Sequence, residues 1–321
     1  MKKILIWIVV VLALSYGGAK LYLHHEVGRS VDQAVGMASL FAEVSYERVA
    51  STITGELTVE GIRVKLPQYR DEIVIDRLGI DTPSFFSLLA LSDLKTFRRN
   101  KMPDYLGVII DGVHVPVDAD YFQDLHEFGM QARGVKDTDL ELDAAAACTG
   151  RYGFAPAMLA RLGYAEQNFS LRLAARNDDS QYSLEFQADI EDMWAAEGRV
   201  TLAGNMMADL ARGAAYRPRL SDLEVVYEDL SLKSRVQKLC AESGLTPEQT
   251  LAAQLETLMF YGESNGIVFD EYVVEPYREF LNGKSTIRFT AQPNNPIAIS
   301  QIGLYKPSDV PALLNLSASV E

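Results

Sequence analysis

The sequence predicts an α+β fold, with an N-terminal transmembrane helix followed by a curved, largely antiparallel β-sheet body and C-terminal helices packed on it. Three observations predict this fold. An apolar run follows two lysines at the N-terminus, a short alternating pattern of apolar residues recurs along the chain, and helical signals gather between residues 232 and 282. Together they place the sheet in the middle of the chain and helices at both ends.

Composition and charge limit the kinds of partner. The chain has 321 residues, of which 48% are hydrophobic and 23% charged, as in ordinary globular proteins. We expect an N-terminal membrane anchor over residues 1–25 and one α+β body over residues 26–321. The net charge of −14 excludes nucleic acid as a favourable partner and disfavours electrostatic docking on anionic lipid. Attachment to a membrane would therefore depend on burial of apolar side chains.

The N-terminal segment supplies such side chains. Lys2 and Lys3 precede the apolar run from Ile4 to Leu14, and the segment through Leu23 has about the twenty residues that cross a bilayer. The lysines would keep the N-terminus in the cytoplasm. The residues that represent this predicted anchor are Ile4, Trp7, Val10, Leu14 and Leu21.

A second interpretation of the N-terminus is a cleaved signal peptide. The small residues from Gly17 to Ala19 have the spacing of a cleavage site. Both interpretations export residues 24–321. We favour the anchor, which predicts a single-pass inner-membrane protein whose body lies in the periplasm.

The two cysteines, Cys148 and Cys240, have two interpretations. In an oxidising compartment they could form a disulfide, which would close a long loop and add roughly 4–5 kcal/mol of stability. The alternative is two separate buried thiols that pack as small apolar side chains. Two cysteines this far apart make no metal motif.

The recurring pattern has two alternating apolar residues, a polar or glycine pair, and two further alternating apolar residues. Its copies are Leu57–Val64, Ile73–Ile80, Val108–Val115 and Val225–Leu232, with a looser copy at Ile297–Leu304. The polar pair shifts the alternation by one residue, and a β-bulge would restore one apolar face while bending the strand. We therefore predict long, bulged, curved strands. Tight hairpin turns at Glu60-Gly61 and Asp111-Gly112 are the alternative.

Other segments have clear local signals. Alternation at 169–173 and 182–188, around a turn cluster at 177–180, predicts a β-hairpin. Helices are expected at 26–43, 232–243, 270–282 and 308–314, and in the segment that follows Thr246. There Thr246, Pro247 and Gln249 have the spacing of a capping box with proline in the first helical position.

No catalytic or metal-binding motif is recognised. None of the four histidines has zinc-motif spacing, and Gly283-Lys284-Ser285 has Arg278 where a phosphate loop needs glycine. Carboxylates in the polar slots of the repeated pattern are interpreted as facing water: Asp76, Asp111, Glu228 and Asp229. We predict that the protein is not an enzyme and has no catalytic, cofactor or metal site.

The predicted anchor and the following segment Ser51–Val64, with its glycine, leucine and valine alternation, resemble the start of AsmA-like and related bacterial envelope proteins. The resemblance covers residues 1–66. It implies a role in envelope maintenance and a lipid held on a curved apolar sheet. We therefore expect a membrane-anchored periplasmic protein that binds lipid or another apolar ligand. The alternative is a non-enzymatic scaffold or assembly factor that binds other envelope proteins.

Overall fold

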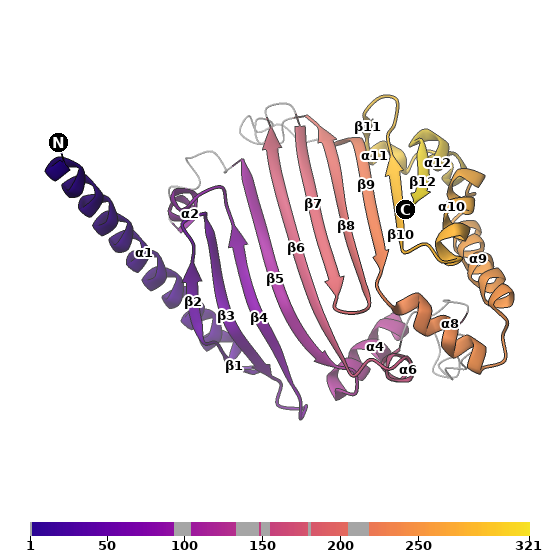
Figure 1. Cartoon of the computed structure of the whole chain (residues 1–321), viewed down its shortest axis with the longest axis horizontal. Helices are drawn as coiled ribbons and strands as arrows, with labels where there is room; N and C mark the ends of the chain where they lie inside the picture. The colour runs from indigo at the N-terminus through magenta and orange to yellow at the C-terminus, as the bar shows by residue number, and fades with distance from the viewer. Residues whose placement is uncertain (1, 93–103, 133–147, 149–154, 179–180, 205–217) are drawn as a thin grey trace. The chain divides into compact units, whose positions relative to one another are not determined.

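The computed structural model has an α+β fold with a large, open, antiparallel sheet, as predicted (Figure 1). It describes residues 2–92, 104–132, 148, 155–178, 181–204 and 218–321. The chain divides into two compact units, Met1–Gly112 and Val113–Glu321. The boundary falls within strand β5 (Tyr105–Pro116), whereas the sequence predicted a single body after the anchor.

The first unit combines a long helix with a small antiparallel sheet. Strand β3 pairs with β1 and β2 on one side and with β4 on the other. The elements are α1 (Lys2–Ala38), β1 (Glu43–Ser45), β2 (Arg48–Ser51), β3 (Glu56–Lys65), β4 (Glu72–Asp81), α2 (Phe85–Ser92) and the first part of β5. Helix α1 joins the predicted anchor and the predicted helix at 26–43 without a break, and it ends at Ala38.

One face of α1 packs against the rest of this unit. Leu23 is fully buried in a cluster with Leu57, Phe85 and Leu88, and Tyr16 packs against the same cluster. Leu23, the last residue counted in the predicted membrane span, is therefore covered by protein. The predicted anchor boundary at residue 25 also falls inside a continuous helix.

Among the predicted anchor residues, the structure describes the side chain of Leu21. Leu21 is 73% exposed. The side chains of Ile4, Trp7, Val10 and Leu14 lie outside the described residues. In the part of the chain that the structure describes, no helix combines the length and the apolar character that a bilayer crossing needs.

The first three copies of the repeated pattern form continuous strands, so the hairpin alternative is wrong. The predicted bulge is also wrong between β3 and β4. Glu60 pairs with Arg77 and Ile62 pairs with Ile75, so no residue is inserted on either strand. Instead, Gly61 has a left-handed backbone conformation, with φ of 65°. Glycine tolerates this conformation, which other residues rarely adopt.

The polar pairs of these copies align across neighbouring strands of the first unit. Gly112 on β5 has φ of 66°, and a side chain added there would meet Asp76 of β4. Arg77 of β4 donates hydrogen bonds to the carboxylates of Asp111 and Glu56. The recurring pattern therefore produces an aligned irregularity within the continuous strands, where Arg77 pairs with the neighbouring carboxylates.

The last two copies have a different structure. Strand β9 (Arg219–Asp229) ends at its polar pair, and helix α8 (Leu232–Glu242) follows. The backbone N–H of Lys233 donates to the Asp229 carboxylate at 2.9 Å, so the polar pair satisfies a helix start here. The looser copy divides between β11 (Ile297–Ala298) and α11 (Ile299–Ile302). The prediction of bulged strands is wrong for both copies.

The second unit contains the larger part of the sheet, with the order β6-β7-β8-β9-β10-β12 and with β11 paired to β9. Its other strands are β6 (Glu166–Asp178), β7 (Gln181–Ile190), β8 (Trp194–Ala203), β10 (Thr286–Ala291) and β12 (Leu316–Val320). Strands β6 and β7 confirm the predicted hairpin, with Leu173 opposite Phe186. The turn residues 179–180 lie outside the described residues.

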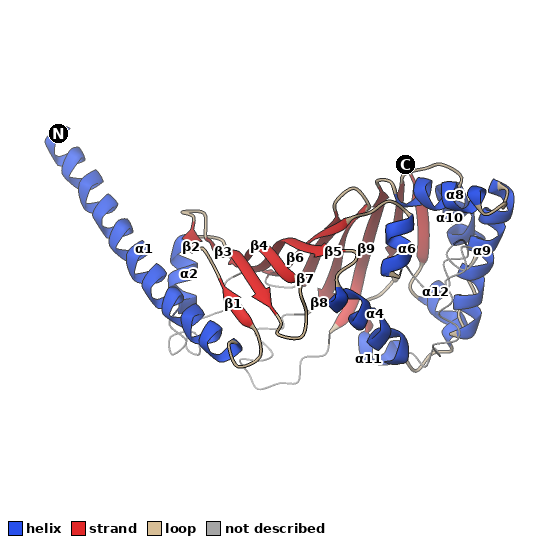
Figure 2. Cartoon of the chain, turned by 90° about the horizontal axis from the view of Figure 1, so that it is seen from below, coloured by secondary structure: helices blue, strands red, loops and turns tan. Residues whose placement is uncertain are grey.

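The C-terminal helices gather at one end of this sheet (Figure 2). They are α8, α9 (Pro247–Ser264), α10 (Glu271–Leu281) and α12 (Val310–Leu313), with a 3₁₀ turn at Pro307–Asp309. Helices α4 (Asp120–Ala132) and α6 (Pro156–Arg161) precede β6. The capping box of Thr246 and Gln249 is confirmed. Tyr272 of α10 is 77% exposed.

A disulfide lies in the main core of the second unit. Cys148 and Cys240 are bonded, with their Cα atoms 5.8 Å apart. Both are fully buried, in a cluster that includes Leu159, Met193 and Val236. Of the two interpretations left open by the sequence, the structure has the pair joined.

Candidate functional site: an apolar sheet face and a polar pocket

The strands of the second unit separate apolar from charged side chains with a clean two-residue period. Successive side chains on a strand point to opposite faces of the sheet, and directly paired residues share a face. Leu173 pairs with Phe186, which pairs with Gly198, and Leu184 pairs with Val200. The apolar face consists of Leu171, Leu173, Ala175, Leu184, Phe186, Ala188, Ala196, Gly198, Val200, Leu223 and Val225.

One border of the apolar face is covered by protein. Phe280 and Leu281 of α10 pack with Ile287 and Tyr227 of the sheet. Trp194 packs against the disulfide core and stacks on Tyr227, with ring centres 6.1 Å apart. The two hydrophobic clusters therefore meet at the same end of β8 and β9.

The middle of the apolar face is open to solvent. Leu173 is 45% exposed and Leu184 is 42% exposed, although both lie opposite apolar residues within the sheet. The ring of Phe186 lies against Gly198, where a side chain would collide with it. Glycine therefore allows the aromatic ring to lie close to the backbone of β8. The result is a low apolar floor beside the covered border.

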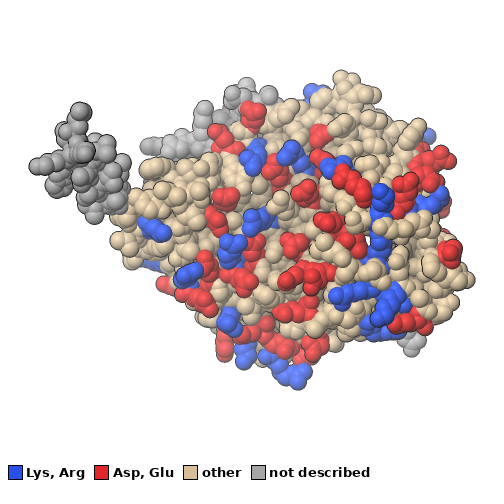
Figure 3. All heavy atoms as spheres, in the orientation of Figure 1, with Lys and Arg blue, Asp and Glu red and all other residues tan. Residues whose placement is uncertain are grey.

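The opposite face of the same strands is charged. Arg176 and Arg199 bind the carboxylate of Glu185 at 3.1 and 3.2 Å, and Arg288 binds Glu224. Charged side chains of both signs cover the face seen in Figure 3. Such exposed ion pairs contribute little stability and keep this face solvated. We call it the charged face.

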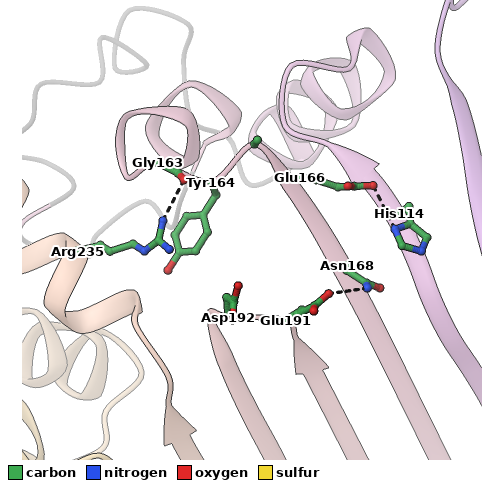
Figure 4. A pocket seen from close by; sticks show the side chains of 9 residues that line it. His114, Gly163, Tyr164, Glu166, Asn168, Glu191, Asp192 and Arg235 are labelled. Carbon is green, nitrogen blue, oxygen red and sulfur yellow. Dashed lines mark hydrogen bonds and ion pairs between the residues drawn. The ribbon is translucent and has the colours of Figure 1, made fainter.

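A polar pocket of about 210 Å³ lies at one end of the strands (Figure 4). The Nδ1 atom of His114 lies 3.2 Å from Oε1 of Glu166. Asn168 donates from Nδ2 to Oε2 of Glu191 at 2.8 Å. Its own Oδ1 is buried and accepts no hydrogen bond from the described residues. The pocket can therefore offer one free acceptor, beside carboxylates, to a small polar group.

The wall of the pocket is held by Arg235 of α8. Its guanidinium donates to the carbonyl oxygens of Leu162 and Gly163 at 3.1 and 3.0 Å. It also lies 4.1 Å from the centre of the Tyr164 ring. With these bonds, Arg235 joins α8 to the loop that leads into β6, and so it acts as a structural clamp.

The pocket and the apolar face are separate. Glu166 and Asn168 alternate along β6 with Phe169 and Leu171, so they belong to the charged face. Among the described residues that line the pocket there is no serine, threonine or cysteine. Within the described residues, no three His, Cys, Asp or Glu side chains are arranged to hold a metal ion. The described lining therefore offers hydrogen-bonding groups to a small polar ligand.

The carboxylates singled out in the sequence do not converge. Asp76 and Asp111 belong to the first unit, while Glu228 is exposed on β9. Asp229 caps α8, and burial raises its pKa above the usual range. Burial has the opposite effect on Lys233, a cation, and lowers its pKa. The Nζ atom of Lys233 donates to the Phe280 carbonyl oxygen at 2.7 Å.

Sequence reasoning missed the pocket, since its residues come from separated segments with no common motif. His114 lies within a copy of the repeated pattern and lacks zinc-motif spacing. Gly283, Lys284 and Ser285 lie in the connection between α10 and β10.

Comparison with known proteins gives a description without a function. A family model described only as "Uncharacterized protein" matches residues 165–321. This range contains β6 to β12 and α8 to α12, and so it includes the apolar face. No curated protein matches the chain. The resemblance to AsmA-like proteins concerns residues 1–66 and stays a prediction.

Proposed function

We propose that this chain is an exported, membrane-attached envelope protein that binds an apolar ligand, such as a lipid acyl chain, on the apolar face of β6 to β9. One observation carries the proposal. Leu173 and Leu184 remain almost half exposed on an apolar face that protein covers along one border. This open apolar surface offers contact to an apolar chain.

The energy of such binding follows from apolar burial. Each methylene removed from water contributes about 0.8 kcal/mol. Association costs roughly 4–15 kcal/mol in lost freedom of motion. A chain of about a dozen buried methylenes would gain roughly 10 kcal/mol, and the Leu173 and Leu184 side chains would add their own burial. Binding therefore requires most of the apolar face.

Two features support export to an oxidising compartment. The disulfide between Cys148 and Cys240 is of a kind that persists in such compartments and is rare in a reducing cytosol. The apolar run from Ile4 to Leu14 follows two lysines, as in inner-membrane anchors and signal peptides. The proposed location is the inner membrane, with the body in the periplasm.

The test compares the wild-type chain with one double variant and one matched control variant. The full chain is produced by export in a bacterial host, extracted in mild detergent, and examined by native mass spectrometry and lipid extraction. Leu173→Gln with Leu184→Gln replaces the floor of the face. Leu230→Gln is the control, because Leu230 has a similar exposure of 49% but lies beyond the end of β9.

We expect a reproducible bound phospholipid or fatty acid in the wild-type chain and in the Leu230→Gln variant. The double variant should lose at least about ten-fold in occupancy, since two polar side chains would lie under the ligand. A ligand-free wild-type chain, or equal occupancy in all three, would contradict the proposal.

A second candidate function is that of a scaffold for other envelope proteins. It is favoured by exposed apolar side chains near the junction of α9 and α10, where Val268 is 57% exposed and Tyr272 is 77% exposed. Leu304, 82% exposed, follows α11 in the segment whose Pro307 lies against Gly266. A partner protein that co-purifies in stoichiometric amount with the wild-type chain, and that is lost from the variant with Tyr272→Ser and Leu304→Ser, would support this function. A monomer under mild extraction would count against it.

A further inference from the structure

The first unit carries exposed apolar side chains at one end of the packed part of α1. Helix α2 lies directly beside α1 there (Figure 1). Phe85 of α2 points inward, is 3% exposed, and has its ring centre 5.0 Å from that of Tyr16 on α1. The next residue, Phe86, is 80% exposed. Phe86 therefore lies near the level of Tyr16 and faces away from the protein.

The turn between β2 and β3 brings a second apolar side chain to the same end. Ile53 is 70% exposed. The turn is fixed next to α2, because Thr82 donates from Oγ1 to the carbonyl oxygens of Gly55 and Ser84, each at 3.0 Å. The hydrogen bond between His24 and Ser51, at 2.8 Å, fixes the start of the turn against α1.

Helix α1 adds two further exposed side chains, Leu21 at 73% and Tyr22 at 58%. They lie beside the buried Leu23 but on the outer side of the helix. We call Leu21, Tyr22, Ile53 and Phe86 the apolar collar. None of these side chains is charged, and toward the N-terminus α1 continues into the apolar run from Ile4 to Leu14.

We propose that the apolar collar lies in the interface of a lipid bilayer, so that the first unit rests on the membrane as well as being attached through α1. The collar and the apolar run belong to one continuous helix and its immediate neighbours. Aromatic and aliphatic side chains with no charge suit the boundary between headgroups and acyl chains. Lys20 can extend its ammonium to the headgroups while its methylenes remain among apolar groups.

The chain's charge favours this mode of contact over electrostatic docking. The net charge is −14, so an anionic lipid surface would repel the body as a whole. Contact must then depend on the uncharged collar. This inference uses the membrane location of the proposed function, but it does not depend on ligand binding by the second unit.

The test places a fluorescent label at matched positions. Cys148 and Cys240 are bonded to each other, so an added cysteine is the reactive thiol. Phe86→Cys is labelled in the full chain, which is reconstituted in phosphatidylethanolamine–phosphatidylglycerol vesicles with a fraction of brominated acyl chains. Phe41→Cys is the control, because Phe41 is 77% exposed and follows the C-terminal end of α1. Between Tyr22 and that end, α1 rises roughly 24 Å.

We expect brominated lipid to quench the label at position 86 by roughly two-fold or more, and the label at position 41 hardly at all, since such contact is confined to the bilayer interface. Ile53→Cys should behave like Phe86→Cys. Equal quenching at 41 and 86, or none at 86, would overturn the proposal. A label at 86 that is shielded from aqueous iodide but not quenched by lipid would overturn it in favour of a protein partner.

The outcomes separate this inference from the proposed function. A chain that floats with vesicles and shows quenching at position 86, but carries no ligand on its apolar face, supports the collar and contradicts ligand binding. A chain that does not associate with vesicles contradicts both the collar and the proposed location.

Discussion

Reduction of the Cys148–Cys240 disulfide should destabilise the second unit strongly. The bond joins residues 92 positions apart in the sequence, and both sulfur atoms lie in a fully buried cluster. In the chain-entropy model, removing a cross-link that closes a loop of this length lowers the free energy of unfolding by about 4–5 kcal/mol. For a unit of this size, that corresponds to a fall in melting temperature of roughly 10 °C or more.

Chemical unfolding followed by Trp194 fluorescence, with and without dithiothreitol, measures this effect. Reduction leaves both sulfur atoms in place and removes only the cross-link. The double variant Cys148→Ala with Cys240→Ala is the control, because dithiothreitol should not change its stability. The variant should be less stable than the reduced wild-type chain, since it also leaves small cavities in the core.

Two results would refute this reasoning. Two reactive thiols in the unfolded protein, after purification from an oxidising compartment, would show that the bond does not form. Equal stability of the oxidised and reduced chains would show that the bond forms but does not restrict the unfolded state. Either result would also weaken the argument for export.

Three further changes have defined outcomes. Gly112→Ala should destabilise the first unit by about 1–3 kcal/mol in urea unfolding, because alanine disfavours φ of 66° and its methyl group would meet Asp76; Gly303→Ala, where nothing lies within 4 Å, is the control. Thr246→Ala should lower the free energy of unfolding by about 1 kcal/mol through loss of the cap on α9. Asp229→Asn should gain stability relative to the wild-type chain as pH rises above the usual aspartate pKa of 3.8, because burial raises the pKa of Asp229 and its ionisation therefore opposes folding.

Each of these predictions has a contrary result. Equal effects of Gly112→Ala and Gly303→Ala would mean that the left-handed conformation is not required. An unchanged thermal melt for Thr246→Ala would mean that the start of α9 does not limit stability. A stability difference between Asp229→Asn and wild type that stays constant from pH 3 to pH 6 would mean that Asp229 titrates alike in the folded and unfolded chain.

Local signals in the sequence predicted local structure well. The Thr246 and Gln249 capping box and the alternation in β6 and β7 each depend on residues close in sequence. The repeated pattern was less reliable, since its polar pair lies inside a continuous strand at Gly112 but ends a strand at Asp229. Which outcome occurs depends on the following segment, because α8 can begin at Leu232. Tertiary packing decides this, and it is not visible in an eight-residue window.

The candidate sites depended still more on tertiary structure. Alternation in single strands indicated apolar and polar faces, but it could not show that one border of the apolar face is covered while Leu173 and Leu184 stay open. The burial of Leu23 was missed for a related reason. An apolar residue in an apolar helix fits lipid and a protein core equally well, and only the position of α2 distinguishes them.

Photo-crosslinking within strand β7 tests the central claim most directly. A photoreactive phenylalanine analogue replaces either Leu184, on the apolar face, or Gln187, which is exposed on the charged face of the same strand. The full exported chain is irradiated in its native envelope and analysed by mass spectrometry. We predict a lipid-sized adduct at position 184 and none at position 187. No adduct at 184, or equal adducts at both positions, would contradict the assignment of the apolar face as a binding site.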